Sequence, residues 1–190
     1  GHNNIALGSN AGEDLTTGNY NAFLGYNTGK NATTSVANVI MGPNAGSSGV
    51  ITGNYNFIAG CCAGADLTSG CDNILIGLKA GLKITTQKWN QFLGWYAGLC
   101  NTGSYNTAIG LCALKGSATP GDNTGTNNAA IGEDALKVLT SGTNNVALGK
   151  EAGFALTSAN GNVILGKSAG CSITTGSCNF LGGYVAGKSL

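Results

Sequence analysis

The sequence has little charge, almost no proline and a single histidine. Charged residues make up 9% of 190, and there are 2 prolines and 1 histidine. So little charge argues against a nucleic-acid partner, whose phosphates need clustered Lys and Arg. No apolar run approaches the length of a membrane span. The scattered acids have no nucleophile–histidine pair or phosphate-binding loop beside them, so we expect no enzyme activity, no metal and no cofactor.

The chain is instead rich in one short phrase, Asn-x-x-(apolar)-Gly, which occurs eleven times at a nearly constant spacing of 17 residues. Self-similarity at a fixed period predicts a repeat array. The array covers residues 1–190, so we expect a single repeat domain that forms part of a longer fibre. The leading asparagines are Asn4, Asn21, Asn38, Asn56, Asn73, Asn90, Asn106, Asn128, Asn145, Asn162 and Asn179.

We number the places of each repeat from its leading asparagine, which is place 1. Apolar residues fill places 2 to 4, Gly fills place 5, Ala place 8 and usually Gly place 9, and a Leu-Thr-Thr-Gly-like phrase follows. Gly at such short intervals makes a poor helix, whereas short β-forming segments between glycines are typical of strands and turns. We therefore predict an all-β fold, a β-solenoid (β-roll or β-helix) of eleven coils.

Stacked coils align equivalent residues in columns. The leading asparagines then form a ladder of side-chain amides that bond along the stack. Ala at place 8 indicates a crowded corner, where only Thr28 departs from the pattern. Gly at place 5 has no exceptions from Gly8 to Gly183, so a Cβ there is expected to clash or to force a disallowed φ.

The strand residues predict self-association. Places 2 and 4 share one face and place 3 lies on the other. We assign place 4 to the lumen, and the rival interpretation puts place 3 there. Both places are apolar, and a strand that is apolar on both sides is covered on both sides. The place-4 residues are Leu7, Leu24, Met41, Ala59, Ile76, Leu93, Ile109, Ile131, Leu148 and Leu165, with Gly182 as the exception.

The phrase Asn-x-Ala-(Leu/Ile)-Gly-x-x-Ala, as in residues 4–11, 106–113, 128–135 and 145–152, resembles the head repeats of YadA-like trimeric adhesins. It is still more similar to the repeats in the shafts of phage and large-virus tail-fibre proteins. The resemblance covers essentially the whole chain. It implies a homotrimer of parallel β-solenoids at a cell or virion surface, engaged in attachment. The adhesin repeat is shorter, so the longer period here needs a larger turn or an extra short strand.

Seven cysteines leave two interpretations open. Local disulfides are one, and small residues in turn and core columns are the other. Disulfides would place the chain outside the cytosol. The candidate pairs are Cys171 with Cys178, Cys100 with Cys112, and Cys61 or Cys62 with Cys71.

Threonine recurs in the Leu-Thr-Thr-Gly phrase and gives hydroxyls at a regular spacing, as in ice-binding solenoids. Ile51 and Asn101 interrupt the column, and the β-propensity of Thr explains it equally well. An ice-binding solenoid is therefore the alternative function. The column consists of Thr16, Thr33, Thr68, Thr85, Thr140, Thr157 and Thr174.

Aromatic residues gather near the sixth repeat and are candidates for contact with a cell-surface glycan or receptor; the alternative is that they cover a coil edge or a neighbouring chain. They are Trp89, Trp95, Tyr96 and Tyr105. The 22-residue seventh repeat extrudes residues 115–122, either a specificity loop or a tolerated insertion. Asn31-Ala32-Thr33 is a lone glycosylation sequon.

The sequence thus predicts a non-enzymatic, extracellular or virion-surface fibre segment whose main partner is itself, as a homotrimer or an end-to-end assembly. A subunit of an end-to-end filament is the third hypothesis.

Overall fold

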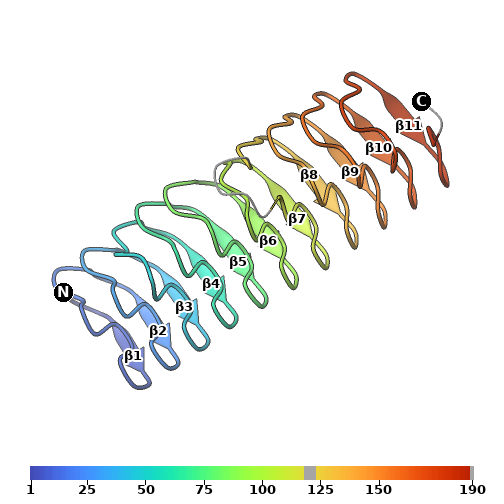
Figure 1. Ribbon diagram of the computed structural model, residues 1–190. Coiled ribbons are helices and arrows are strands. Elements are labelled where there is room, and N and C mark those ends of the chain that lie inside the picture. The colour runs from blue at the N-terminus through green and yellow to red at the C-terminus, as the bar shows by residue number, and fades with distance from the viewer. Residues whose placement is uncertain (118–122, 189–190) are drawn as a thin grey trace. The chain divides into compact units, whose positions relative to one another are not determined.

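In the computed structural model, which describes residues 1–117 and 123–188, the described chain contains only short strands and turns (Figure 1). The predicted all-β solenoid fold is confirmed, with one three-residue strand for each repeat. The strands are β1 (Ile5–Leu7), β2 (Ala22–Leu24), β3 (Val39–Met41), β4 (Phe57–Ala59), β5 (Ile74–Ile76), β6 (Gln91–Leu93), β7 (Thr107–Ile109), β8 (Ala129–Ile131), β9 (Val146–Leu148), β10 (Val163–Leu165) and β11 (Phe180–Gly182).

The chain divides into two compact units, Gly1–Asn90 with β1 to β5 and Gln91–Leu190 with β6 to β11. Within each unit neighbouring strands pair in parallel and in chain order, and equivalent places face each other. Ala6 pairs with Phe23, for example, and Ala130 with Ala147. The expectation of one domain over residues 1–190 stays a prediction.

Backbone hydrogen bonds join successive coils around their whole perimeter, not only at the strands. At place 9 the amide of Gly29 donates to the carbonyl of Ala45 (2.9 Å), and at place 13 the amide of Thr68 donates to Thr85 (2.9 Å). Immediately before the next leading asparagine, the amide of Tyr55 donates to the carbonyl of Val36 (3.1 Å). Each coil is therefore a rung whose polar backbone groups are satisfied by its neighbours.

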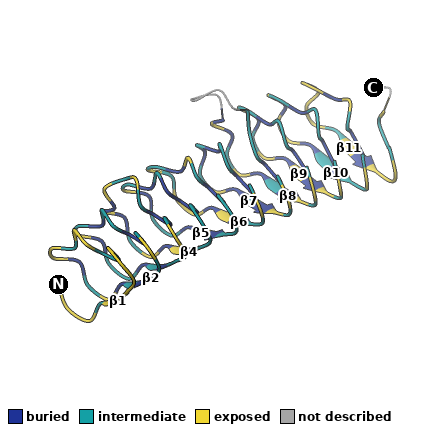
Figure 2. Cartoon of the chain, turned by 60° about the horizontal axis from the view of Figure 1, so that its bottom comes forward, coloured by how far each residue is buried: buried dark blue, intermediate teal, exposed yellow. Residues whose placement is uncertain are grey.

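The assignment of place 4 to the lumen is wrong, and the rival interpretation is right. Place 3 is buried in every coil after the first, and Phe23, Ile40 and Ile164 are 0% exposed. Figure 2 colours the chain by burial class, with buried residues in dark blue. Place 4 faces outward instead, with Leu7 and Leu148 exposed. The outward or half-buried place-4 residues are Leu7, Leu24, Met41, Ala59, Ile76, Leu93, Ile109, Ile131, Leu148, Leu165 and Gly182.

Alternation along the strand gives the physical reason. The side chain at place 1 is a buried asparagine, and residues two apart in a strand share a face. Asn145 and Ala147 therefore both point into the coil, at 0% and 1% exposure. Places 2 and 4 alternate with places 1 and 3 along the strand, so their side chains point to the outer face.

The leading asparagines form a continuous hydrogen-bonded ladder within each unit. The side chain of Asn56 accepts from both the backbone and side-chain N–H groups of Asn73 (3.1 and 3.0 Å). The same amide of Asn73 also donates to the carbonyl of Gln87, which lies near the end of the same repeat (2.9 Å). Asn73 thus bonds both to the neighbouring coil and to a second segment of its own repeat.

The glycine at place 5 is required for both of the expected reasons. Gly149 has φ +135°, a conformation that L side chains rarely adopt, and a Cβ there would lie 2.6 Å from the carbonyl oxygen of Gly166. The close backbone approach allows adjacent coils to stack directly after each strand.

In the sixth and seventh coils the residues at places 3 and 9 share the lumen, and a large residue at one place accompanies a small residue at the other. A Cβ on Gly98 would lie 2.2 Å from the ring of Phe92, so the large strand residue needs glycine opposite. In the next coil the strand residue is Ala108, and place 9 is Leu114, buried in the left-handed region at φ 48°. The leucine fills the space that the phenylalanine occupies below, because a protein interior tolerates few voids.

Candidate interaction surfaces

The outer face of the sheet in each unit is apolar and uncharged. We define the outer sheet face as the side chains at places 2 and 4. In the first unit all ten are apolar, including Ile5 at 63%, Phe57 at 38% and Ile74 at 38% exposure. In the second unit Gln91 and Thr107 are the only polar members. Strands with this composition on both faces are normally covered on both.

Exposed aromatic residues flank several of the strands in the sequence. The residue before each leading asparagine and the residue at place 6 flank the strand in sequence. The exposed aromatic members are Tyr20, Tyr26, Tyr55 and Trp89 in the first unit and Trp95, Tyr105 and Tyr184 in the second. The residues before the leading asparagines, such as Tyr55 (φ 59°) and Tyr105 (φ 61°), have left-handed backbones that turn the chain into the strand. An apolar band bordered by aromatics is the composition of a recognition surface.

Three of the four predicted glycan contacts lie in the second unit, and Trp89 belongs to the first. Trp95 and Tyr96 stack edge to face, with ring centroids 5.7 Å apart. The Lys115 ammonium lies 6.0 Å from the Tyr96 ring centroid. Trp95 is 54% exposed, so one face of this aromatic pair is open to a ligand. Tyr105, the fourth predicted contact, is also exposed.

The threonine phrase forms a hydroxyl-bearing edge. The side chains of Thr16, Thr68 and Thr140 each donate to the carbonyl of the equivalent residue in the next coil, at 3.1 Å in every case. Ile51 interrupts the hydroxyls of this column, because its side chain is buried while its carbonyl accepts from the amide of Thr33 (3.1 Å). The column resumes at Thr52, whose amide donates to the carbonyl of Thr68 (2.9 Å).

A second hydroxyl rank lies beside the first, which the sequence reasoning missed because it looked two residues on, where Gly stands. The next residue in the chain is exposed and hydroxyl-bearing in most coils. These residues are Thr17, Thr34, Ser69, Thr86, Ser141, Ser158 and Thr175.

All seven cysteines are free thiols, so none of the candidate disulfides is formed in this structure. Cys100 and Cys112 stack on different residues: the amide of Cys100 donates to Lys115, whereas that of Cys112 donates to Trp95. Cys62 with Cys71, and Cys171 with Cys178, occupy different places of their coils. Cys61 and Cys62 are close, with their Sγ atoms 3.4 Å apart.

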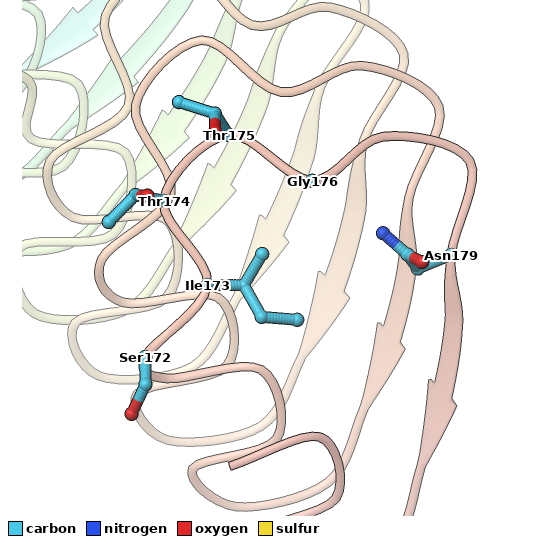
Figure 3. Close-up of a pocket in the computed structure, with 6 residues that line it drawn as sticks. All are labelled: Ser172, Ile173, Thr174, Thr175, Gly176 and Asn179. Atoms are coloured by element: carbon cyan, nitrogen blue, oxygen red, sulfur yellow. The ribbon is translucent and has the colours of Figure 1, made fainter. Parts of the chain in front are cut away.

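A pocket of about 280 Å³ lies at the last coil, lined by Ser172, Ile173, Thr174, Thr175, Gly176 and Asn179 (Figure 3). Ile173 and Asn179 point into it, as their equivalents point into the lumen of other coils. The pocket is therefore the coil surface that, elsewhere in each unit, the next coil covers.

The other predicted sites have structural roles or fall partly outside the described residues. The sequon residue Asn31 donates through its amide to the carbonyl of Ser47 (3.0 Å), so the nitrogen is already engaged. Residues 118–122 of the predicted loop at 115–122 lie outside the described residues. Its base is closed by Asn123, whose side chain bonds the amide and carbonyl of Ser117 (2.7 and 2.8 Å).

The described residues contain no group of three or more His, Cys, Asp or Glu side chains that could hold a metal ion. They also contain no helix long and apolar enough to cross a membrane. Comparison with protein-family models, with curated proteins and with solved structures finds no match for this chain.

Proposed function

We propose that this chain is a structural segment of a surface fibre, in which three copies associate along the outer sheet face and together support attachment to a surface or host receptor. The observation that carries the proposal is the uncharged apolar face that runs through every coil of each unit. The number three and the extracellular or virion setting come from the resemblance to trimeric adhesin and tail-fibre repeats.

The energetics favour a long array. If each of ten outer-face side chains in one unit buries roughly 50 Å², the gross gain is about 12 kcal/mol at about 25 cal/mol per Å². Association costs about 4 to 15 kcal/mol in lost freedom. An array of a few coils would therefore associate only weakly. Each further coil adds buried apolar area, whereas the loss of translational and rotational freedom is incurred only once.

The attachment role rests on the Trp95–Tyr96 pair with Lys115. Exposed aromatic faces stack on sugar rings, and the neighbouring ammonium can bond hydroxyl or carboxylate groups. The rigid coil beneath holds the pair because the amide of Cys112 donates to the carbonyl of Trp95 (2.9 Å). The proposal assigns no reaction to this surface.

Native mass measurement tests the association. The wild-type chain should have the mass of three chains, and Leu148→Glu, which places a charge on the outer sheet face, should shift it to one. Ser141→Glu is the matched control, because Ser141 is exposed on the threonine edge. A wild-type monomer at micromolar concentration, or equal effects of both variants, would refute the association.

Glycan-array or cell binding tests the attachment role separately. Trp95→Ala should abolish binding while the oligomer mass stays unchanged. Tyr26→Ala is the matched control, because Tyr26 is an exposed aromatic residue at the same place 6 of another coil and is not a predicted glycan contact. Unchanged binding by Trp95→Ala would remove the aromatic pair from the proposal.

Ice binding is a second candidate, favoured by the two adjacent hydroxyl ranks. Four first-rank hydroxyls, those of Thr16, Thr68, Thr140 and Thr157, donate to carbonyls of the next coil at 3.1 Å. Their positions therefore repeat at the coil spacing of about 4.8 Å. Thermal hysteresis by the wild type that is lost in Ser158→Lys would support it. The absence of thermal hysteresis in the wild type would eliminate it.

A further inference from the structure

Two adjacent cysteines form a close thiol pair in the turn after β4. Cys61 and Cys62 occupy places 6 and 7, directly after the place-5 glycine, and their Sγ atoms are 3.4 Å apart. Both side chains are half-buried, so they can be reached from solvent. No other pair of cysteine sulfurs among the described residues makes such a contact.

The backbone of this pair is held by the coils on both sides. The amide of Cys62 donates to the carbonyl of Pro43 (3.1 Å), and the carbonyl of Cys61 accepts from the amide of Lys79 (2.9 Å). Cys62 also has a left-handed backbone, at φ 56°. The two thiols are therefore brought together by the fold before any ligand arrives, which lowers the ordering cost of binding.

The spacing favours a bent chelate. Two bonds of about 2.3 Å, the length typical of a metal–thiolate bond, to sulfurs 3.4 Å apart enclose an angle of about 95°. Trivalent arsenic has bond angles near a right angle, whereas a two-coordinate linear metal ion would need the sulfurs much farther apart. A disulfide between neighbours would be strained, because consecutive Cα atoms lie about 3.8 Å apart and disulfides usually need about 4.4 to 6.8 Å.

A ligand that bonds to both sulfurs must displace the thiol protons. Burial raises the pKa of the Cys62 thiol, as do its hydrogen bond and charge interaction with Cys61, and the nearby Lys79 ammonium opposes them. A divalent metal that binds two thiols releases their protons to solvent. An arsenoxide instead carries its own proton acceptor, since its oxygen leaves as water.

We propose that Cys61 and Cys62 form a dithiol site that chelates trivalent arsenic of the arsenoxide class. In the binding step two S–H bonds and the arsenic–oxygen double bond break, and two As–S bonds form. The oxygen takes both thiol protons and leaves as one water molecule. No atom changes oxidation state, so no oxidant or reductant is needed.

Intact-mass spectrometry of the reduced full-length chain with phenylarsine oxide tests the site. One adduct per chain should form with loss of one water, survive excess 2-mercaptoethanol and reverse with a small dithiol. Cys61→Ser and Cys62→Ser should each weaken binding by at least about 100-fold, because the second bond then lacks the effective concentration of an intramolecular partner.

Cys71→Ser is the matched control, because Cys71 is half-buried in the same unit and burial likewise raises the pKa of its thiol. It should bind like the wild type. Circular dichroism should show the same β fold for all variants. An adduct that persists in Cys61→Ser with unchanged affinity, or its absence from the wild type, would overturn the site.

Discussion

Replacing one internal asparagine of the ladder, Asn145→Ala, should destabilise the solenoid strongly. The Asn145 side chain makes four hydrogen bonds: its amide donates to the Oδ1 of Asn128 (3.1 Å) and to the carbonyl of Ala159 (2.7 Å), and its Oδ1 accepts from the backbone and side-chain N–H groups of Asn162 (both 3.0 Å). All of these contacts are buried, so water cannot replace them.

The magnitude follows from the orphaned groups. A hydrogen bond contributes about 1 kcal/mol net, and a buried donor left without a partner costs about 1 to 3 kcal/mol. The Asn162 side-chain amide keeps its bond to the carbonyl of Gly176 (2.9 Å), but its backbone N–H loses its acceptor. We therefore expect a loss of about 4 kcal/mol in the free energy of unfolding.

Urea unfolding followed by circular dichroism, at one fixed protein concentration, measures this loss. Asn179→Ala is the matched control. It removes the same side chain from the same column, but there the amide makes only the bond to Asn162 among the described residues (3.0 Å). The control should lose about 1 kcal/mol or less. Equal losses in both variants, or a loss below about 1 kcal/mol in Asn145→Ala, would refute the reasoning.

Three further predictions concern packing and thiol reactivity. Gly98→Ala should lower stability by about 2 to 4 kcal/mol in urea unfolding, because its Cβ meets the Phe92 ring; the double variant Gly98→Leu with Phe92→Ala should lose less than the sum of its single changes. Gly149→Ala should cost about 3 kcal/mol or more, since φ +135° and the carbonyl of the next coil both exclude a Cβ; a change in midpoint too small to detect would contradict this. Cys62 and Cys71 should react with iodoacetamide more slowly than a peptide cysteine at neutral pH, because their raised pKa values leave less thiolate, and the difference should shrink as pH rises; peptide mapping by mass spectrometry measures both rates.

The orientation of the strand is where sequence reasoning failed, although the signal was present. Places 3 and 4 are both apolar, so hydrophobicity did not separate them. The asparagine at place 1 separates them. A ladder of side-chain amides lies inside the coil, and because residues two apart in a strand share a face, place 3 lies inside as well. Phe23 at 0% exposure and Leu148 at 48% follow from that parity.

The register of the threonine column in the third repeat and the sulfur contact of the thiol pair were beyond sequence reasoning for a different reason. The third repeat has one extra residue, and only the hydrogen bond from Thr52 to Thr68 shows how the chain absorbs it. Likewise the adjacency of Cys61 and Cys62 is visible in the sequence, but their sulfur contact depends on the left-handed backbone of Cys62.

The sequence by itself determined the period, the position of every strand and the need for glycine at place 5, because these depend on local sterics repeated eleven times. Only the tertiary structure decided which strand face is inside, which place-9 residue fills the lumen beside Phe92 or Ala108, and which side chains meet at the surface. Those outcomes depend on how each coil closes on itself and stacks on its neighbour, and a chain of short apolar segments is compatible with more than one way of closing.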